Sequence, residues 1–133
     1  MNLYRSDTAA MKFSDITLWV ADATLSYKFY KKLGFEIVEV NDRHAVVACE
    51  GIKIILITMR DEDEFNKDSL ASIRGLGMYI RFNIKNVDEK YQKIVSLGIQ
   101  TSSEPRDWPW GTREFVVKDL DGYKLCFVQE LEG

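Results

Sequence analysis

Three tryptophans are the side chains of this sequence best suited to hold a flat or cationic small molecule. Trp108 and Trp110 stand on either side of a proline, and Trp19 lies far from them along the chain. Indole rings stack on planar ligands and attract cations through their faces. The structural alternative is that these rings pack within a loop or a dimer interface. Both interpretations hold together if a binding site lies at such an interface.

Two charged residues, Asp15 and Arg81, complement the tryptophans. Arg81 can bind a carboxylate or phosphate through a fork of hydrogen bonds, and Asp15 can bind an amine. Alternatively, the two residues pair with each other, or with Tyr79, as a satisfied polar cluster. If the protein is catalytic, Asp15 and Tyr79 are the candidates for acid and base chemistry, because both side chains can exchange a proton.

The other reactive residue types suggest structural roles. We expect Arg113 and Glu114, at the start of a strand, to form a structural ion pair or to protect a sheet edge. Cys49 and Cys126 lack the spacing of a metal site, so we expect both to be free, buried thiols. The only histidine, His44, falls in a hairpin strand and is expected at a surface edge. The sequence contains no glycine-rich phosphate loop and no nucleophile elbow.

Alternation of residue types predicts which strands position these side chains. Residues 13–21 and 78–85 each alternate an aliphatic position with a polar or aromatic one, which indicates strands with two different faces. The aliphatic faces suit the side covered by helices, so the mixed faces should line a pocket together with the last strand of each half. The predicted ligand-binding residues are Asp15, Trp19, Ile55, Tyr79, Arg81, Asn83, Trp108, Trp110 and Cys126.

The order strand–helix–strand–strand–strand is predicted twice along the chain. The first copy has strands at 13–21, 35–40, 43–49 and 52–59, and a helix that ends at Gly34. The second copy has strands at 78–85, 99–102, 112–118 and 122–129, and a helix that ends at Gly98. Asp22 or Thr24 is expected to cap the first helix, and Asn86 or Asp88 the second.

An internal duplication explains this order. A shift of 64 residues places Asp22 on Asn86 and Leu33-Gly34 on Leu97-Gly98. In the closing hairpins the shift is 71, and the additional seven residues fall in the loop that carries Trp108 and Trp110. The second copy therefore has an insertion that the first lacks.

Composition limits the class of protein. The chain has 133 residues, 46% of them hydrophobic, and a net charge of −3 from 18 basic and 21 acidic residues. These values suit one folded domain and argue against nucleic acid as a partner, which normally requires a basic surface. No apolar run approaches the 18 or so residues of a membrane span. Residues 1–10 are polar and lack a signal sequence, so we expect a cytoplasmic protein.

The expected domain layout follows from the duplication. Residues 1–11 are predicted to be a flexible arm and residues 12–133 a single domain. Within that domain, units at 12–60 and 76–131 are joined by a charged linker at 61–75, for which a flap over a pocket is the alternative.

Two groups of residues resemble a known superfamily. They are Val-Ala-Asp…Phe-Tyr-Lys-Lys-Leu-Gly-Phe in the first half and Trp-Gly-Thr-Arg-Glu-Phe…Asp-Leu-Asp-Gly in the second. Together with the duplication they resemble the vicinal oxygen chelate superfamily, which includes glyoxalase I, extradiol dioxygenases, and fosfomycin and bleomycin resistance proteins. The resemblance implies an α+β fold in which the curved mixed sheets of two tandem βαβββ units enclose a cavity, with the helices outside.

The resemblance also implies where a metal would bind. Metal-dependent members take His, Gln or Glu ligands from positions that correspond here to Asp15, Ile55, Tyr79 and Cys126. Ile55 has no donor atom, whereas a zinc, iron or manganese site normally needs at least three protein ligands. We therefore expect no metal and no other cofactor. An atypical site made of Asp15, Tyr79 and Cys126 is the alternative.

Three functional hypotheses follow. The first is a metal-free protein similar to the bleomycin resistance branch, which sequesters a cationic or aromatic small molecule in a cleft between the subunits of a homodimer. The second is a lyase or dioxygenase of the same superfamily with an atypical metal site or metal-free acid–base chemistry. The third is an interaction module whose cavity is filled by its own Trp19, Tyr79 and Arg81.

Overall fold

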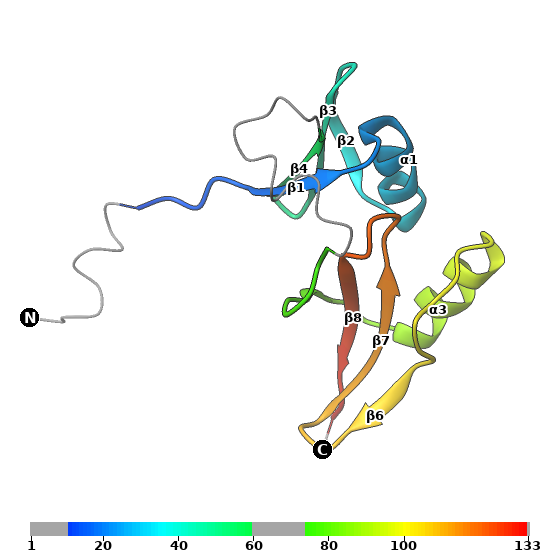
Figure 1. The fold of residues 1–133 in the computed structure, drawn as a ribbon. Helices are drawn as coiled ribbons and strands as arrows, with labels where there is room; N and C mark the ends of the chain where they lie inside the picture. Colours follow the sequence, from blue (N-terminus) through cyan, green and yellow to red (C-terminus); the bar gives the residue numbers. More distant parts are fainter. Residues whose placement is uncertain (1–10, 60–73, 133) are drawn as a thin grey trace, which may run out of the picture.

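A computed structural model describes residues 11–59 and 74–132 of the chain. The described residues form two βαβββ units in series (Figure 1). Unit 1 consists of β1 (Ile16–Val20), α1 (Ala23–Leu33), β2 (Glu36–Val40), β3 (His44–Cys49) and β4 (Ile52–Thr58). Unit 2 consists of β5 (Ile80–Asn83), α3 (Val87–Ser96), β6 (Arg106–Trp108), β7 (Thr112–Lys118) and β8 (Lys124–Glu130). The predicted α+β fold with two tandem units is confirmed.

Parts of the predicted layout fall outside the described residues. The arm at 1–11 and the linker at 61–75 lie almost entirely there, so both stay predictions. Within the described parts of the chain, neither helix combines the length and hydropathy needed to cross a bilayer.

Each unit forms one four-stranded mixed sheet. The strand orders are β1-β4-β3-β2 and β5-β8-β7-β6, with the first pair of each sheet parallel and the others antiparallel. Ile16 lies opposite Ile54 in the first sheet, and Ile80 lies opposite Leu125 in the second. The same register thus recurs after shifts of 64 and 71 residues, which are the shifts that the sequence repeat predicts.

Matching caps begin the two helices. The carboxylate of Asp22 accepts hydrogen bonds from the backbone N–H groups of Thr24 and Leu25, at 2.8 and 3.2 Å. Asn86 caps α3 in the same way, through one backbone amide. These side chains satisfy donors that the first turn of a helix leaves unpaired. Gly34 ends α1 at φ 108°, a conformation that favours glycine.

One hydrophobic core joins the two units. Tyr30 of α1 contacts the ring of Phe35 at a centroid distance of 5.1 Å, and Phe35 contacts Phe82 of β5 at 5.3 Å. Phe82 in turn stacks on Phe127 of β8 at 5.7 Å. Because Tyr30, Phe35 and Phe127 belong to one buried cluster and Phe82 packs against it, the helix-covered side of each sheet is the core side. The predicted aliphatic faces are therefore placed correctly.

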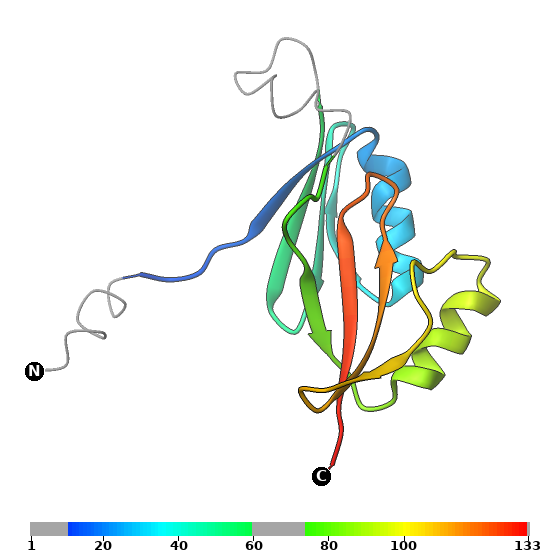
Figure 2. The ribbon, with the colours of Figure 1, turned by 60° about the horizontal axis from the view of Figure 1, so that its bottom comes forward.

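The turn between β7 and β8 fastens unit 2 to unit 1. Figure 2 shows this turn beside α1 at one end of the sheets. The buried hydroxyl of Tyr30 donates to Asp119 at 2.6 Å, and the backbone N–H of Ala21 donates to Asp121 at 2.8 Å. Polar groups from both units are satisfied by this turn, so the Asp-Leu-Asp-Gly sequence has a structural role at the boundary between the units.

One predicted strand is wrong. Residues 99–102 are irregular, and the second strand of unit 2 forms later in the chain, at Arg106–Trp108. Gly111, at φ 90°, closes a tight turn that sets Trp108 opposite Thr112. Residues 106–108, just before that turn, therefore form an antiparallel pair with the start of β7. Trp108 consequently lies on a strand and not in a loop.

Candidate ligand-binding site

Four strands of the second sheet bring side chains together on the face opposite the core. Arg81 of β5 lies opposite Cys126 of β8, and Cys126 lies opposite Val116 of β7. Trp108 of β6 lies opposite Thr112 at the start of β7. Paired residues share a face of a sheet, so these side chains all point away from the core. This face holds a pocket of about 220 Å³, lined by Tyr79, Arg81, Ser103, Trp108, Trp110, Glu114, Phe115, Val116 and Cys126.

Glu114 is the centre of the polar contacts in this pocket. The residue is only 6% exposed, and its carboxylate forms a two-pronged ion pair with Arg81 at 2.9 and 3.3 Å. It also accepts hydrogen bonds from Trp110 Nε1 at 3.1 Å and from Thr112 Oγ1 at 2.5 Å. The thiol of Cys126 donates to it at 3.3 Å. One carboxylate thus fixes side chains from β5, β7, β8 and the turn before β7.

These contacts set the charge states of the cluster. Burial on its own would raise the pKa of Glu114, but hydrogen bonds from Thr112, Trp110, Arg81 and Cys126 outweigh it and lower that pKa to about 2. Burial raises the pKa of Cys126 to about 12, and the neighbouring carboxylate adds to the effect. At neutral pH the pair is therefore a carboxylate and a neutral thiol.

The two tryptophans of the pocket form a stack. The rings of Trp108 and Trp110 lie 4.8 Å apart at an interplanar angle of 12°, and the guanidinium of Arg106 sits 3.8 Å from the centre of the Trp108 ring. Trp110 remains 62% exposed although its N–H group is bound to Glu114. A fixed and exposed indole is a surface on which another flat group can stack.

The pocket collects five of the nine predicted ligand-binding residues, namely Tyr79, Arg81, Trp108, Trp110 and Cys126. Asp15, Trp19 and Ile55 belong to unit 1 and do not line it. Asn83 is exposed at the end of β5 and lies outside the pocket lining. Within one chain, the structure therefore assembles the unit 2 part of the predicted site without the unit 1 part.

The proposed pairing of Arg81 with Asp15 or Tyr79 is not observed, since Arg81 pairs with Glu114. Asp15 accepts hydrogen bonds from Ser14 and Thr17 at 2.6 and 3.3 Å. The hypothesis that the protein fills its own cavity with Trp19, Tyr79 and Arg81 loses support, because Trp19 does not line the pocket.

Sequence reasoning did not select four of the lining residues, namely Ser103, Glu114, Phe115 and Val116, and Glu114 is the one that organises the site. We expected Arg113 and Glu114 to act as one structural pair, but consecutive residues of a strand point to opposite faces. Arg113 instead forms ion pairs with Asp88 at 3.0 Å and Asp107 at 2.9 Å. The alternation that places Glu114 on the same face as Val116 was the signal that could have identified it.

The four positions at which the resemblance implies metal ligands do not fit a metal. Ile55 offers no donor, and the Cys126 thiol is protonated at neutral pH and bound to Glu114. Within residues 11–59 and 74–132, no group of three or more His, Cys, Asp or Glu side chains is arranged to hold an ion.

Two βαβββ units on a shared core, with a pocket on the far face of a mixed sheet, define a duplicated α+β class that hosts both binding proteins and enzymes. Residues 12–127 match the Glyoxalase/Bleomycin resistance protein/Dioxygenase superfamily, and the chain belongs to this superfamily.

Two relatives that match most of the chain are both bleomycin resistance proteins. A bleomycin resistance protein from Geobacillus stearothermophilus is 31% identical, over 86% of this chain and 93% of its own length. A bleomycin resistance protein from Staphylococcus aureus matches with the same identity and coverage.

Solved structures support the fold. A glyoxalase/bleomycin resistance protein/dioxygenase from Nocardioides gives a TM-score of 0.76 at 21% identity, covering 98% of this chain and 93% of its own. A lactoylglutathione lyase from Agrobacterium tumefaciens gives 0.67 at 18% identity, covering 89% and 92%. At these identities the likeness concerns the fold alone.

Proposed function

We propose that this protein binds and sequesters a planar aromatic or cationic small molecule on the exposed face of Trp110, without a metal or other cofactor. The observation that carries the proposal is the Trp108–Trp110 stack, held in place by the buried carboxylate of Glu114. The similarity to bleomycin resistance proteins supports a binding function of this kind.

The polar contacts of the pocket favour stacking over charge pairing. Glu114 is already neutralised by Arg81, so its carboxylate is not free to bind a cationic ligand directly. The attraction for a cation comes instead from the indole faces. Because Trp110 is fixed by its bond to Glu114, the ligand meets a preorganised ring, and little conformational entropy is lost on binding.

The size of the pocket supports a site completed by a second subunit. Ligand pockets typically measure about 300–1,000 Å³, and the pocket on unit 2 measures only about 220 Å³. The unit 1 face with Asp15, Trp19 and Ile55 is related to it by the sequence repeat and lies outside this pocket. In a cytoplasmic homodimer, the unit 1 face of one copy covers the unit 2 pocket of the other.

Titration calorimetry tests this proposal with two probes, bleomycin and the planar cation proflavin. We expect saturable binding of at least one probe, at one molecule per chain. Trp110→Ala should weaken it by about tenfold or more, since stacking on one aromatic ring contributes roughly 1–3 kcal/mol. Trp110→Phe keeps a ring and should retain most of the affinity. Equal affinity of all three proteins would contradict the proposal.

Two further measurements address the subunits and the metal. Sedimentation equilibrium should give a dimer at the concentrations used for titration. Elemental analysis of protein purified without chelators should give far less than one zinc, iron or manganese per chain. Near-stoichiometric metal would instead favour the lyase or dioxygenase alternative, in which Asp15 or Tyr79 takes part in chemistry.

A further inference from the structure

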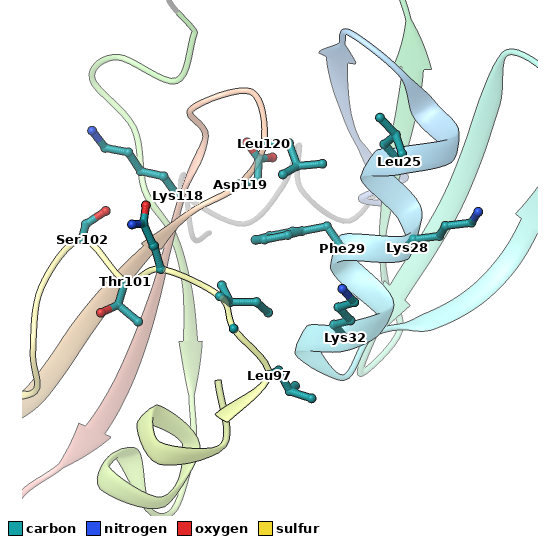
Figure 3. Close-up of a pocket in the computed structure, with 13 residues that line it drawn as sticks. Leu25, Lys28, Phe29, Lys32, Leu97, Thr101, Ser102, Lys118, Asp119 and Leu120 are labelled. Atoms are coloured by element: carbon teal, nitrogen blue, oxygen red, sulfur yellow. The ribbon is translucent and has the colours of Figure 1, made fainter. Parts of the chain in front are cut away.

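A separate cleft lies between α1 and the segment that follows α3 (Figure 3). Its volume is about 910 Å³, which is large enough for a whole small molecule. None of its lining residues belongs to the pocket around Trp110. An inference about this cleft therefore does not depend on the proposed function.

The middle of the cleft is apolar. In Figure 3 the ring of Phe29 projects from α1 toward the segment after α3, with Leu120 above it. Leu25, Leu97 and Leu120, which line the cleft, are 56%, 43% and 60% exposed. Single exposed leucines are common on protein surfaces. Several leucines around one aromatic ring form an apolar patch, and such a patch marks a binding surface.

The rim of the cleft is cationic. Lys28 and Lys32 lie four residues apart on α1, and Lys118 lies across from them at the end of β7. In Figure 3 the amine of Lys32 points toward Phe29, whereas Lys28 and Lys118 extend away from the middle of the cleft and must rotate to reach a ligand. None of the three forms an ion pair with another described residue. This local excess of positive charge contrasts with the net charge of −3 for the whole chain.

The carboxylate in the lining does not offset these lysines. Asp119 is buried and accepts the hydroxyl hydrogen bond of Tyr30 at 2.6 Å. It also accepts the backbone N–H groups of Asp121 and Tyr123, both at 2.9 Å. Its oxygens are occupied within the fold, so the charge that the cleft presents to a ligand comes from the lysines.

We propose that this cleft binds a soluble amphipathic organic anion, with an apolar body and one terminal carboxylate or sulfonate. The apolar body lies against Phe29, Leu25 and Leu120. The anionic group reaches the rim, where the long and flexible side chains of Lys28 and Lys32 turn toward it. Medium-chain fatty acids have this chemistry. We expect the cleft to take them as free anions from solution and not as part of a lipid bilayer.

Titration calorimetry with decanoate, below its micelle concentration and without vesicles, tests the site. We expect one decanoate per chain, and much weaker binding of acetate and of decanol, because each lacks one half of the recognised chemistry. The double variant Lys28→Gln/Lys32→Gln should weaken decanoate binding roughly fivefold, in line with two exposed ion pairs. Leu120→Ser, in an exposed turn, should weaken it as well.

A matched control separates the site from overall charge. Lys31→Gln/Lys93→Gln changes the net charge equally, and neither lysine lines the cleft. This variant should bind decanoate as the wild type does. Equal weakening by both double variants, or equal binding of decanol, would overturn the proposal. Binding to vesicles of anionic lipid in place of free decanoate would also overturn it.

A competition experiment distinguishes this site from the tryptophan pocket. Saturating proflavin should leave the affinity for decanoate unchanged, and Trp110→Ala should bind decanoate normally. Loss of decanoate binding in Trp110→Ala would place the anion in the tryptophan pocket and contradict the inference. Failure of proflavin to bind, with decanoate behaviour as described, would count only against the proposed function.

Discussion

Trp110 donates its indole N–H to Oε2 of Glu114 at 3.1 Å, and the two residues lie four positions apart around a tight turn. The same carboxylate binds Arg81, so the exposed ring and a strand at the edge of the sheet share one anchor. The orientation of the proposed stacking surface therefore depends on a single buried charge.

Glu114→Gln should make the stability of the protein less dependent on acid pH. In the folded protein the pKa of Glu114 is about 2, below its ordinary value of 4.5. The ionised form is therefore favoured by folding, and its contribution is fully present above pH 4.5 and is lost as the pH falls toward 2. The contribution is on the order of 3 kcal/mol. Urea unfolding at pH 7, 4 and 3 measures it.

In that experiment the wild type should exceed Glu114→Gln in unfolding free energy at pH 7, and the gap should narrow at pH 3. Other carboxylates titrate in both proteins and cancel in the difference. Glu104→Gln, at an exposed position, serves as the control and should track the wild type. A gap that stays constant from pH 7 to pH 3 would show that Glu114 is not held ionised by its partners.

Cys126 should resist alkylation in the folded protein. The residue is 2% exposed and the pKa of its thiol is raised to about 12, so little thiolate is present at pH 8. Iodoacetamide labelling followed by peptide mass spectrometry should find Cys126 modified only after unfolding. Glu114→Gln removes the negative charge that helps to hold the thiol protonated and should speed the reaction. Complete labelling of native wild type within minutes would refute this account of the cluster.

Tyr30→Phe should destabilise the junction between the units. The Tyr30 hydroxyl is fully buried and donates to Asp119 at 2.6 Å. Removing it leaves the buried carboxylate one hydrogen bond short, at a cost of about 1–3 kcal/mol. Tyr27→Phe, on the same helix, should change stability little. Urea unfolding compares the two variants, and equal stabilities would mean that the Tyr30 bond contributes nothing to the fold.

Much of the fold could be predicted because local signals agree with the repeat. Asp22 and Asn86 are good helix caps, lie 64 residues apart, and both begin helices. Period-two alternation identified the core faces of β1 and β8 for the same reason. The misplaced strand at 99–102 shows the limit, because pairing there was decided by the turn at Gly111 and not by the strand residues themselves.

The site was predicted only in part. Period-two alternation along β5 and β8 predicted that Arg81 and Cys126 face the pocket, and the structure places them opposite each other. Alternation could not predict that Arg81 forms an ion pair with Glu114, because that contact joins β5 to β7 across β8. It also assigned Trp19 to the same pocket, whereas the packing of the two units within one chain keeps the unit 1 face separate.

The most direct test of the central proposal is a crystal structure of the protein with proflavin. We predict a homodimer with flat ligand density stacked on the exposed face of Trp110, and with Trp19 of the partner subunit on the opposite side. A ligand bound away from Trp110, or a metal ion coordinated beside Cys126, would contradict the proposal.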